Sequence, residues 1–263
     1  MIDKMKDEPK DIHKRHLERQ QQRRREMKRR RIIFFTTLII LFVLIVVYFT
    51  PLFNIRKVVI LGNSRIEDAQ ITKTIGEIDS ENLFRVNTKK IKKDVKTIAY
   101  IDKVSFDKKI LPPTLKVKVV ECKPVAYFVF NESSVIVDKK LKILEISDTA
   151  AKGLPVVEGL NLTNSTLGYT ADVDDKEKSK ELIKCLDVIS AEGLENSINN
   201  LSVEDVNNIT FTYENRLDII CGSTLDFDVK IKMLKKALNS KTLAENSKGE
   251  IDLSITGKAI YSP

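Results

Sequence analysis

The strongest constraint on this chain is an uncharged apolar run near its N-terminus. Residues 32–49 read IIFFTTLIILFVLIVVYF, 18 positions without a charged side chain, and residues 50–53 extend the run to 22. At 1.5 Å per residue, a helix of that length measures about 27 to 33 Å, which matches the hydrocarbon core of a bilayer. We therefore expect residues 32–53 to form a transmembrane helix.

A cleaved signal peptide is the alternative interpretation of this run. Its apolar core would span about 7 to 15 residues and would end at a small-residue cleavage site of the A-x-A kind. The run is longer than that, and its exit, YFTPLF at residues 48–53, contains no such site. These two features favour an uncleaved anchor, with Tyr48 as an interfacial aromatic residue.

The charge of the chain is concentrated before the apolar run. Residues 1–31 hold 13 Lys or Arg and 6 Asp or Glu, which gives a net +7 of the chain's +8. By the positive-inside rule this tail is cytoplasmic, and everything after residue 50 is extracytoplasmic. The remainder is close to neutral, so we expect no nucleic-acid partner, and the run RRREMKRRR is typical of a topology signal beside anionic lipid.

Residues 54–123 show the pattern of a small α+β domain. Five segments alternate between strand and helix periodicity in the order β-α-α-β-β. They are strand 58–61, a helix from Ser64 to Gly76, a helix within 88–101, strand 104–106 and strand 114–121. Two amphipathic helices on a three-stranded sheet supply a core near the lower size limit for a domain.

The two helices carry end signals and apolar stripes. Ser64 and Glu67 fit a capping box, with Ser64 as N-cap and Glu67 at N3, and Gly76 is placed as a C-terminal cap. The stripes are expected in the core. They consist chiefly of Ile66, Ala69, Ile71, Ile75, Ile91, Val95 and Ile98.

Strand 114–121 is bounded by prolines on both sides. Leu115, Val117 and Val119 lie on one face, Pro112-Pro113 precedes the strand, and Pro124 follows it. Proline cannot donate to a ladder, so sheet pairing is expected to stop or change partner at both places. We therefore place a domain border here, with one domain over 54–123, a mainly antiparallel β domain with flanking helices over 124–256, and a tail over 257–263.

Short strands and two helices are predicted in the second domain. Polar turns at 131–134 and 214–215 indicate two hairpins, and Asp174 or Asp175 is expected to cap a helix within 171–193. The other elements are strands 127–130, 135–137, 141–146, 209–213 and 217–221, a helix over 228–239, and a terminal strand over 250–256.

The terminal strand is predicted to lie at a sheet edge. Residues 250–256 alternate between an apolar and a polar set, flanked by Gly249 and Gly257. The two sets are Ile251, Leu253 and Ile255, and Asp252, Ser254 and Thr256. A last strand is easily left with unpaired backbone groups. The alternative is that this strand only closes the sheet and that residues 257–263 fray.

No arrangement for catalysis is found in the sequence. No histidine follows His16, so the region after the apolar run lacks an imidazole base, and His13 with His16 is a weak metal signal. No Gly-rich phosphate-binding motif is present. Cys122, Cys185 and Cys221 lie in apolar segments, as expected of buried thiols. We expect no enzyme activity, no catalytic or metal-binding residues and no cofactor.

The order of these features resembles the bacterial cell-division FtsQ/DivIB family. Beyond the basic tail and the single span, the resemblance rests on motifs that follow one another along the chain. They are VVILGNSRIEDAQI, LPPTLKVKVVECKPVAYF, VIVDKKLKIL, LPVVEGL, LDIICGS, VKIKMLKKAL and GEIDLSI. The resemblance implies a POTRA-type domain followed by a mainly β domain. It also implies a membrane-anchored divisome scaffold, concentrated at the septum, that links septal cell-wall synthesis proteins through extracytoplasmic contacts.

The resemblance further implies partners and a binding site. In the family, the C-terminal strand and the helix region before it receive the external segments of small single-span coiled-coil proteins, FtsB/DivIC-like and FtsL-like, by strand addition. The POTRA-type domain would contact other division membrane proteins. Carried onto this sequence, the partner-binding residues are Ile251, Asp252, Leu253, Ser254, Ile255, Thr256, Lys258, Ile260 and Tyr261. Tyr261 would act as an aromatic anchor.

A second class of function is compatible with the same elements. An envelope sensor or a transport accessory could use a POTRA-type module to bind extended polypeptides. The position of a fluorescent fusion in a dividing cell distinguishes the two classes of function. A midcell ring indicates the division scaffold, and uniform membrane label indicates the alternative.

Overall fold

The computed structural model describes residues 8–240 and 247–263, with side chains from residue 25 onward within those ranges. The imidazoles of His13 and His16 lie outside that description. Helix α1 (Glu8–Phe49) has 42 residues and contains the apolar run. Among the described residues, one helix segment, Arg25–Phe49, is long and apolar enough to cross a membrane.

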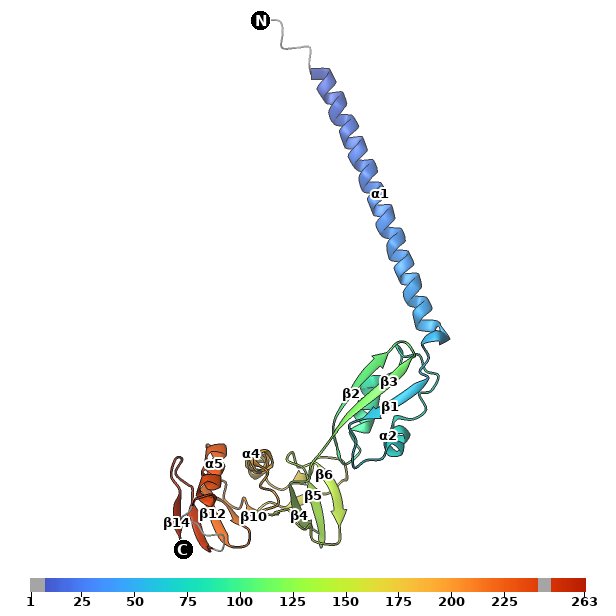
Figure 1. Ribbon diagram of the computed structural model, residues 1–263. Helices are drawn as coiled ribbons and strands as arrows, with labels where there is room; N and C mark the ends of the chain where they lie inside the picture. Colours follow the sequence, from blue (N-terminus) through green and yellow to red (C-terminus); the bar gives the residue numbers. More distant parts are fainter. Residues whose placement is uncertain (1–7, 241–246) are drawn as a thin grey trace, which may run out of the picture. The chain divides into compact units, whose positions relative to one another are not determined.

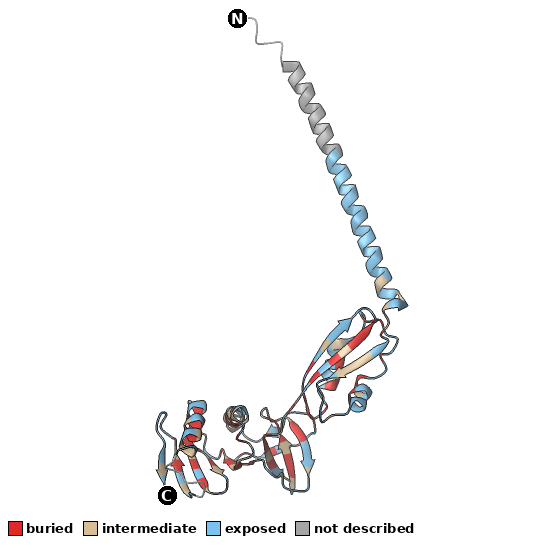
Figure 2. Ribbon diagram, viewed as in Figure 1, coloured by how far each residue is buried: buried red, intermediate tan, exposed pale blue. Residues whose placement is uncertain are grey.

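The apolar side chains of α1 have no protein cover. Every residue from 25 to 46 is exposed, as the pale blue helix in Figure 2 shows. A helix that is apolar all round and unburied matches lipid rather than water. The α-helix ends at Phe49, short of the predicted Phe53, because Pro51 cannot continue it, and Pro51–Phe53 form the 3₁₀ turn η1.

The chain folds into two compact units. The first contains α1 and the chain up to Val58, with the segments Ile78–Val86 and Lys108–Leu115. The second contains Val59–Glu77, Asn87–Asp107 and Lys116–Pro263. The division between the units runs through the β-α-α-β-β region.

The predicted β-α-α-β-β order is confirmed. The elements are β1 (Lys57–Leu61), α2 (Asp68–Ile75), α3 (Thr88–Val95), β2 (Ile101–Lys109) and β3 (Thr114–Glu121). The three strands form one sheet in the order β1-β3-β2, visible in Figure 1. β3 is therefore the central strand, and its bounds are those predicted from the alternation of its side chains.

The predicted stripes supply most of this core. Ile71, Val95 and Ile98 are buried, whereas Ile66 is half-buried and Ala69 is exposed. On β3 the alternating set is Leu115, Val117 and Val119, and all three are buried. The two faces of the central strand thus differ as the sequence predicts.

The predicted capping box at Ser64 is wrong. α2 begins at Asp68, and its N-cap, Glu67, makes no side-chain cap hydrogen bond. The carboxylate of Glu121, at the end of β3, instead accepts the backbone N–H groups of Ser64, Arg65 and Ile66 at 2.8 to 3.0 Å. A full negative charge from a distant strand thus binds the Ser64 N–H that the side chain of Glu67 was expected to accept, and the helix starts one turn later.

A nine-stranded sheet forms the larger part of the second unit. Its order is β14-β13-β12-β11-β10-β7-β4-β5-β6, with mostly antiparallel neighbours. The strands are β4 (Ala126–Phe130), β5 (Ser133–Val137), β6 (Ile143–Ser147), β7 (Val156–Glu158), β10 (Ile198–Ser202), β11 (Ile209–Tyr213), β12 (Leu217–Gly222), β13 (Gly249–Asp252) and β14 (Ile260–Ser262). A separate two-stranded ribbon joins β8 (Leu162–Asn164) and β9 (Asp172–Val173).

Both predicted hairpins form. The β11–β12 turn consists of Glu214 and Asn215, each with positive φ, as predicted. The β4–β5 turn also has two residues, Asn131 and Glu132, so β5 begins two positions earlier than predicted. Two left-handed residues in succession match the right-handed twist of the flanking strands, which explains why the turns are this short.

Two helices cover one side of this sheet. α4 (Lys176–Glu192) has Asp175 as its N-cap, which accepts N–H groups from Glu177 and Lys178, and α5 spans Phe227–Leu238. Figure 1 shows both helices on the same side of the strands. Their inward side chains share a single core with the sheet, and they include Leu182, Leu186, Ile189, Ile231 and Leu234.

Candidate partner-binding site

The predicted edge strand lies inside the sheet. β13 pairs in parallel with β12, with Ile251 opposite Ile219, and it pairs antiparallel with β14, with Ile251 opposite Tyr261. Both sides of its backbone are therefore occupied. The prediction that residues 250–256 form an open edge is wrong, because the last residues of the chain fold back as a further strand.

The terminal strand is also shorter than predicted. Ile251 and Leu253 are fully buried, but Ile255 is 61% exposed. The side chain of Asp252 accepts the N–H of Ser254 at 2.7 Å, and Lys258 donates its N–H to the carbonyl of Ile255 at 3.1 Å. These local hydrogen bonds turn the chain after Leu253, so the alternation cannot continue to Thr256.

The polar set lies on the solvent side, as expected. Asp252 is half-buried, and Ser254 and Thr256 are exposed. Hydrogen bonds from Ser254 hold the pKa of Asp252 below its ordinary value. The hydroxyl of Thr256 donates to Asp226 at 3.3 Å. Asp252 is the last ladder residue of β13, and Ser254 and Thr256 belong to the turn into β14.

Residues 260–262 form β14, so the alternative of a frayed tail is wrong for these residues. Ile260 is 43% exposed, and Lys258 is exposed in the preceding turn. The ring of Tyr261 packs against the core and its hydroxyl donates to the carbonyl of Lys248 at 2.7 Å. Tyr261 is therefore not a free aromatic anchor, and the exposed apolar side chain of this strand is Ile260.

The direction of the backbone groups in β13 follows from its bonds to β12. Gly249 donates its N–H to the carbonyl of Arg216, directly before β12, at 3.2 Å, and Leu253 donates its N–H to the carbonyl of Ile220 in β12 at 2.7 Å. Backbone groups alternate in direction along a strand. Glu250 and Asp252 therefore direct their N–H and C=O groups toward β14.

β14 consequently has one residue whose backbone faces outward. Ile260 and Ser262 lie opposite Asp252 and Glu250, so their backbone groups point back at β13. Tyr261 lies between them and directs its N–H and C=O away from β13. This backbone pair is the hydrogen-bonding capacity of the β14 edge.

The opposite edge of the sheet is partly covered. Ile143, at the start of β6, donates its N–H to the carbonyl of Tyr169 and accepts the N–H of Gly168, each at 2.9 Å. Lys142 also forms an isolated bridge with Thr170. The loop over residues 168–170 thus occupies the backbone groups at the start of β6.

A cluster of polar contacts within the second unit joins the segment Lys96–Ile101 to the turn before β6. The ammonium of Lys142 donates to the carbonyls of Lys96, Ile98 and Ile101, at 2.6 to 2.9 Å. Lys96 is the C-cap residue of α3, Ile98 lies in the turn that follows, and Ile101 begins β2. Burial lowers the pKa of Lys142 from its ordinary value.

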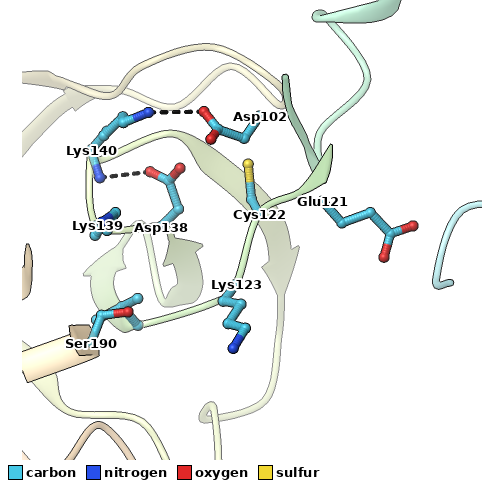
Figure 3. Close-up of a pocket in the computed structure, with 9 residues that line it drawn as sticks. Asp102, Glu121, Cys122, Lys123, Asp138, Lys139, Lys140 and Ser190 are labelled. Carbon is cyan, nitrogen blue, oxygen red and sulfur yellow. Dashed lines mark hydrogen bonds and ion pairs between the residues drawn. The ribbon is translucent and has the colours of Figure 1, made fainter. Parts of the chain in front are cut away.

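Two further pairs reinforce this junction. Lys140 donates to the carboxylate of Asp102 at 2.9 Å, as Figure 3 shows, and Tyr100 donates its hydroxyl to Glu145 at 2.7 Å. Partial burial raises the pKa of Asp102, but the hydrogen bond and charge of Lys140 outweigh it, so the net pKa lies below its ordinary value. The ring of Tyr100 also packs beside Cys122 and Leu144.

The cavity beside this junction does not have the chemistry of a catalytic site. It measures about 210 Å³, and Cys122 lies in it close to Asp138 (Figure 3). Burial, with the charge of Asp138, raises the pKa of Cys122 to about 12. The thiol is therefore protonated at neutral pH and is a poor nucleophile. Cys185 and Cys221 are also buried and free, as predicted.

Sequence reasoning did not identify the junction residues. Lys140 and Lys142 lie in a polar turn, and their partners are 38 to 46 positions earlier in the chain. No periodicity or motif connects segments at such a separation. Within the described ranges, no group of three or more His, Cys, Asp or Glu side chains is arranged to hold a metal ion.

Comparison with known proteins agrees with the fold. Residues 53–121 match the family described as POTRA domain, FtsQ-type. The cell division protein DivIB of Clostridium acetobutylicum is 28% identical over 217 residues, which cover 81% of this chain and 84% of that protein. DivIB of Clostridium tetani is 23% identical, over 80% of this chain and 79% of that protein. The cell division protein FtsQ of Koribacter versatilis is 27% identical over 58% of this chain and 43% of that protein.

The fold defines a class of protein: a membrane-anchored POTRA-domain protein that acts through contacts with other proteins. Its parts are an apolar N-terminal helix, a POTRA domain and a large β sheet. The chain is similar over about four-fifths of its length to DivIB cell-division proteins, and its residues 53–121 belong to the FtsQ-type POTRA family. Its role is in cell division, and this family is not a known class of enzymes.

Proposed function

We propose that this protein is a scaffold of the divisome. Its basic tail, residues 1–31, lies in the cytoplasm, and the bulk of the chain lies outside the membrane and is concentrated at the division septum. The POTRA domain, over 54–123, contacts other division membrane proteins. The β domain, over 124–256, with the segment 257–263 that follows it, links septal cell-wall synthesis proteins.

The proposed partner-binding site is the β14 edge with its supporting residues. An extended segment of a small single-span coiled-coil protein, FtsB/DivIC-like or FtsL-like, adds to β14 as a further strand. The backbone of Tyr261 supplies the ladder bonds, and Ile260 contacts apolar side chains of the partner. Ile251 and Leu253 hold β13 in place from the core, and Asp252 ends β13 opposite Ile260. The remaining proposed residues form the turn between the strands. They are Ser254, Ile255, Thr256 and Lys258.

One observation carries this proposal: among the described residues the β14 edge is short and unpaired, whereas the β6 edge is partly occupied. The N–H and C=O of Tyr261 point away from β13, while Ile143 of β6 is already bonded to the loop over 168–170. Unpaired strand edges are templates for strand addition. Relatives over four-fifths of the chain are division proteins, which makes a division partner the expected occupant.

A pair of substitutions at one position tests the site. Tyr261→Pro removes both the ring and the outward N–H, whereas Tyr261→Ala removes the ring and keeps the N–H. We expect Tyr261→Pro to bind the external segment of the partner more weakly than Tyr261→Ala, by about threefold to tenfold for one lost hydrogen bond. Equal affinities of the two variants, measured by titration of the full chain in detergent, would place the site elsewhere.

Ser254→Pro is not a test of the ladder, because the N–H of Ser254 is bonded to Asp252 rather than to a strand. The division role itself is tested by the position of a fluorescent fusion of the full chain. We expect a midcell ring in dividing cells. A uniform membrane label would instead indicate an envelope sensor or transport accessory.

A further inference from the structure

Outside α1, the first unit exposes four large apolar side chains. Leu52 is 67% exposed, Phe84 45%, Ile110 48% and Leu111 78%. Among the described residues Leu111 is the most exposed large apolar side chain, above even the apolar side chains of α1, of which Phe49 at 70% is the highest. Exposed apolar side chains gathered in one part of a fold indicate a surface that contacts another apolar phase.

Asn82 fixes the segment Ile78–Val86 to the end of α1. Its side-chain amide donates to the carbonyl oxygens of Val47 at 3.1 Å and of Thr50 at 3.3 Å, and its side chain is buried. These two carbonyls belong to the last turn of α1 and the residue after it. The segment that carries Phe84 is therefore tied to the point at which the helix ends.

Aromatic contacts strengthen this connection. The ring of Phe84 meets the ring of Phe53 edge to face at 5.5 Å between centroids. The guanidinium of Arg85 lies 5.2 Å from the ring centroid of Tyr48. The side chains of tyrosine and arginine each have an apolar body and a polar end. Such side chains are often found at the depth of the lipid headgroups. Phe84 thus lies beside residues expected at the membrane interface.

The turn between β2 and β3 lies at the same end of the unit. Arg56, shortly after η1, donates its N–H to the carbonyl of Pro113 at 3.0 Å. Ile110 and Leu111 precede Pro112 and Pro113 directly, so at most a few residues separate them from this contact. Leu52, in η1 itself, completes the set.

The net charge of the first unit after α1 also favours a position at the bilayer surface. The parts of the first unit that follow α1 carry five basic side chains, which are Arg56, Lys57, Arg85, Lys108 and Lys109. They carry two acidic ones, Asp79 and Glu81, so the net charge is +3. Basic side chains next to exposed apolar ones match a bilayer surface with anionic headgroups.

We propose that Leu52, Phe84, Ile110 and Leu111 form a lipid-contact surface that inserts into the leaflet from which the anchor emerges. Ile110 and Leu111 enter the boundary between headgroups and acyl chains, and Lys108 and Lys109 contact headgroup phosphates. Apolar groups at this boundary are typically buried about 5 to 10 Å deep. The bilayer would thus hold the first unit at two places, the span and this surface.

The chain contains no tryptophan, which permits a direct test. Leu111→Trp introduces a single fluorophore at the centre of the surface. In the full chain reconstituted in phosphatidylcholine vesicles, we expect its emission to shift to shorter wavelength. We also expect lipids brominated near the headgroup end of the acyl chain to quench it more strongly than lipids brominated near the chain terminus.

Leu225→Trp is the matched control. Leu225 is 69% exposed and belongs to the second unit, without any of the contacts that tie the surface to α1. We expect its emission to stay at the wavelength of an exposed tryptophan and to resist both brominated lipids. Unquenched emission from Leu111→Trp would overturn the proposal. A shift to shorter wavelength without quenching would also overturn it, since protein rather than lipid would then cover the residue.

The role of the lysines is tested with a second lipid composition. Addition of phosphatidylglycerol should increase the quenching of Leu111→Trp. The combined substitutions Lys108→Gln and Lys109→Gln should remove that increase and leave the quenching in pure phosphatidylcholine. An increase that persists in the lysine variant would refute the headgroup contact.

Discussion

Gly168 lies directly against the carbonyl oxygen of Thr97, so a side-chain carbon at position 168 would overlap that oxygen. The φ of Gly168 is +83°, a conformation that side-chain-bearing residues rarely adopt. The loop that carries Gly168 is the one that also covers the β6 edge. One glycine thus determines both the contact with the end of α3 and the protection of this edge.

Gly168→Ala should destabilise the second unit by more than left-handed strain alone. The strain costs about 1 to 2 kcal/mol, and the overlap with Thr97 adds to it. Gly193→Ala is the control, because Gly193 has φ +68° but no atom near its missing side chain. We expect urea unfolding of the full chain in detergent, followed by circular dichroism, to show the larger loss for Gly168→Ala. Equal losses would show that the contact with Thr97 contributes nothing.

Lys142→Met should weaken the junction between the segment Lys96–Ile101 and the turn before β6. Methionine has a similar length to lysine but no ammonium group, so the substitution leaves three carbonyls without their charged donor. We expect a loss of about 2 kcal/mol in the free energy of unfolding. Lys139→Met is the control, because Lys139 forms an exposed pair with Asp187 that is worth at most about 1 kcal/mol. A loss no greater than that of the control would contradict the structural role of Lys142.

Glu121→Gln should remove a stabilising charge in a pH-dependent manner. Partial burial raises the pKa of Glu121, but the N–H groups of Ser64, Ile66 and Arg65 outweigh it and hold the net pKa below its ordinary value. A carboxylate with a lowered pKa in the folded state contributes stability above its unfolded pKa of about 4.3 and loses it as the pH falls through the folded pKa. We expect the free energy of unfolding of the wild type at pH 7 to be larger than that of Glu121→Gln by about 1 kcal/mol.

The difference in free energy of unfolding between the wild type and Glu121→Gln should shrink as the pH is lowered from 5. It should be absent once Glu121 is protonated in both the folded and the unfolded state. Thermal unfolding of the full chain over this pH range measures it. A difference that is constant with pH would mean that the charge of Glu121 has no part in the effect.

The combined substitutions Leu41→Arg and Leu44→Arg should abolish insertion of α1. Each arginine near the centre of a span costs about 2.5 to 3.5 kcal/mol on insertion scales. Leu41→Val with Leu44→Val keeps the segment apolar and serves as the control. We expect only the control to remain in the membrane fraction after carbonate extraction. Full-length arginine variant in that fraction would contradict the anchor.

Local signals predicted the elements whose stabilising contacts are also local. The alternation of Leu115, Val117 and Val119 gave the bounds of β3, and Asn215 with its neighbour marked the β11–β12 turn. Asp175 was one of two predicted caps for α4. In each case the residues that determine the element lie within it or directly beside it, so periodicity and turn preference were sufficient.

Prediction failed where a distant group competes with a local one. Ser64 has the residues of a capping box, but Glu121, 57 positions later, binds its N–H. The terminal strand failed for a related reason. The side chain of Asp252 ends the strand by accepting the N–H of Ser254. Residues 260–262 then pair with β13 and cover the edge that was predicted to be open. Alternation in the sequence does not report which neighbour a strand acquires.

The candidate site was predicted in its region but not in its detail. Ile260 and Tyr261 were expected to extend the contact, and they lie in the strand that forms the edge, whereas Ile251 and Leu253 are core residues beneath it. In the proposed site, the backbone of Tyr261 takes the role that was predicted for its ring. That change depends on which backbone groups of β13 face β12, and the sequence carries no signal for it.

The shortness of β14 has a consequence for a protein confined to a surface. Molecules anchored in one membrane meet at far higher local concentration than in solution, and at a septum they are crowded further. A long unpaired edge under those conditions would join copies of the chain into ladders with one another. With a single outward backbone residue at Tyr261, two copies gain too few hydrogen bonds to remain together. Only an occupant that adds contacts of its own beyond the ladder would be held. Under the proposed function, the edge can therefore stay open to a partner without causing polymerisation.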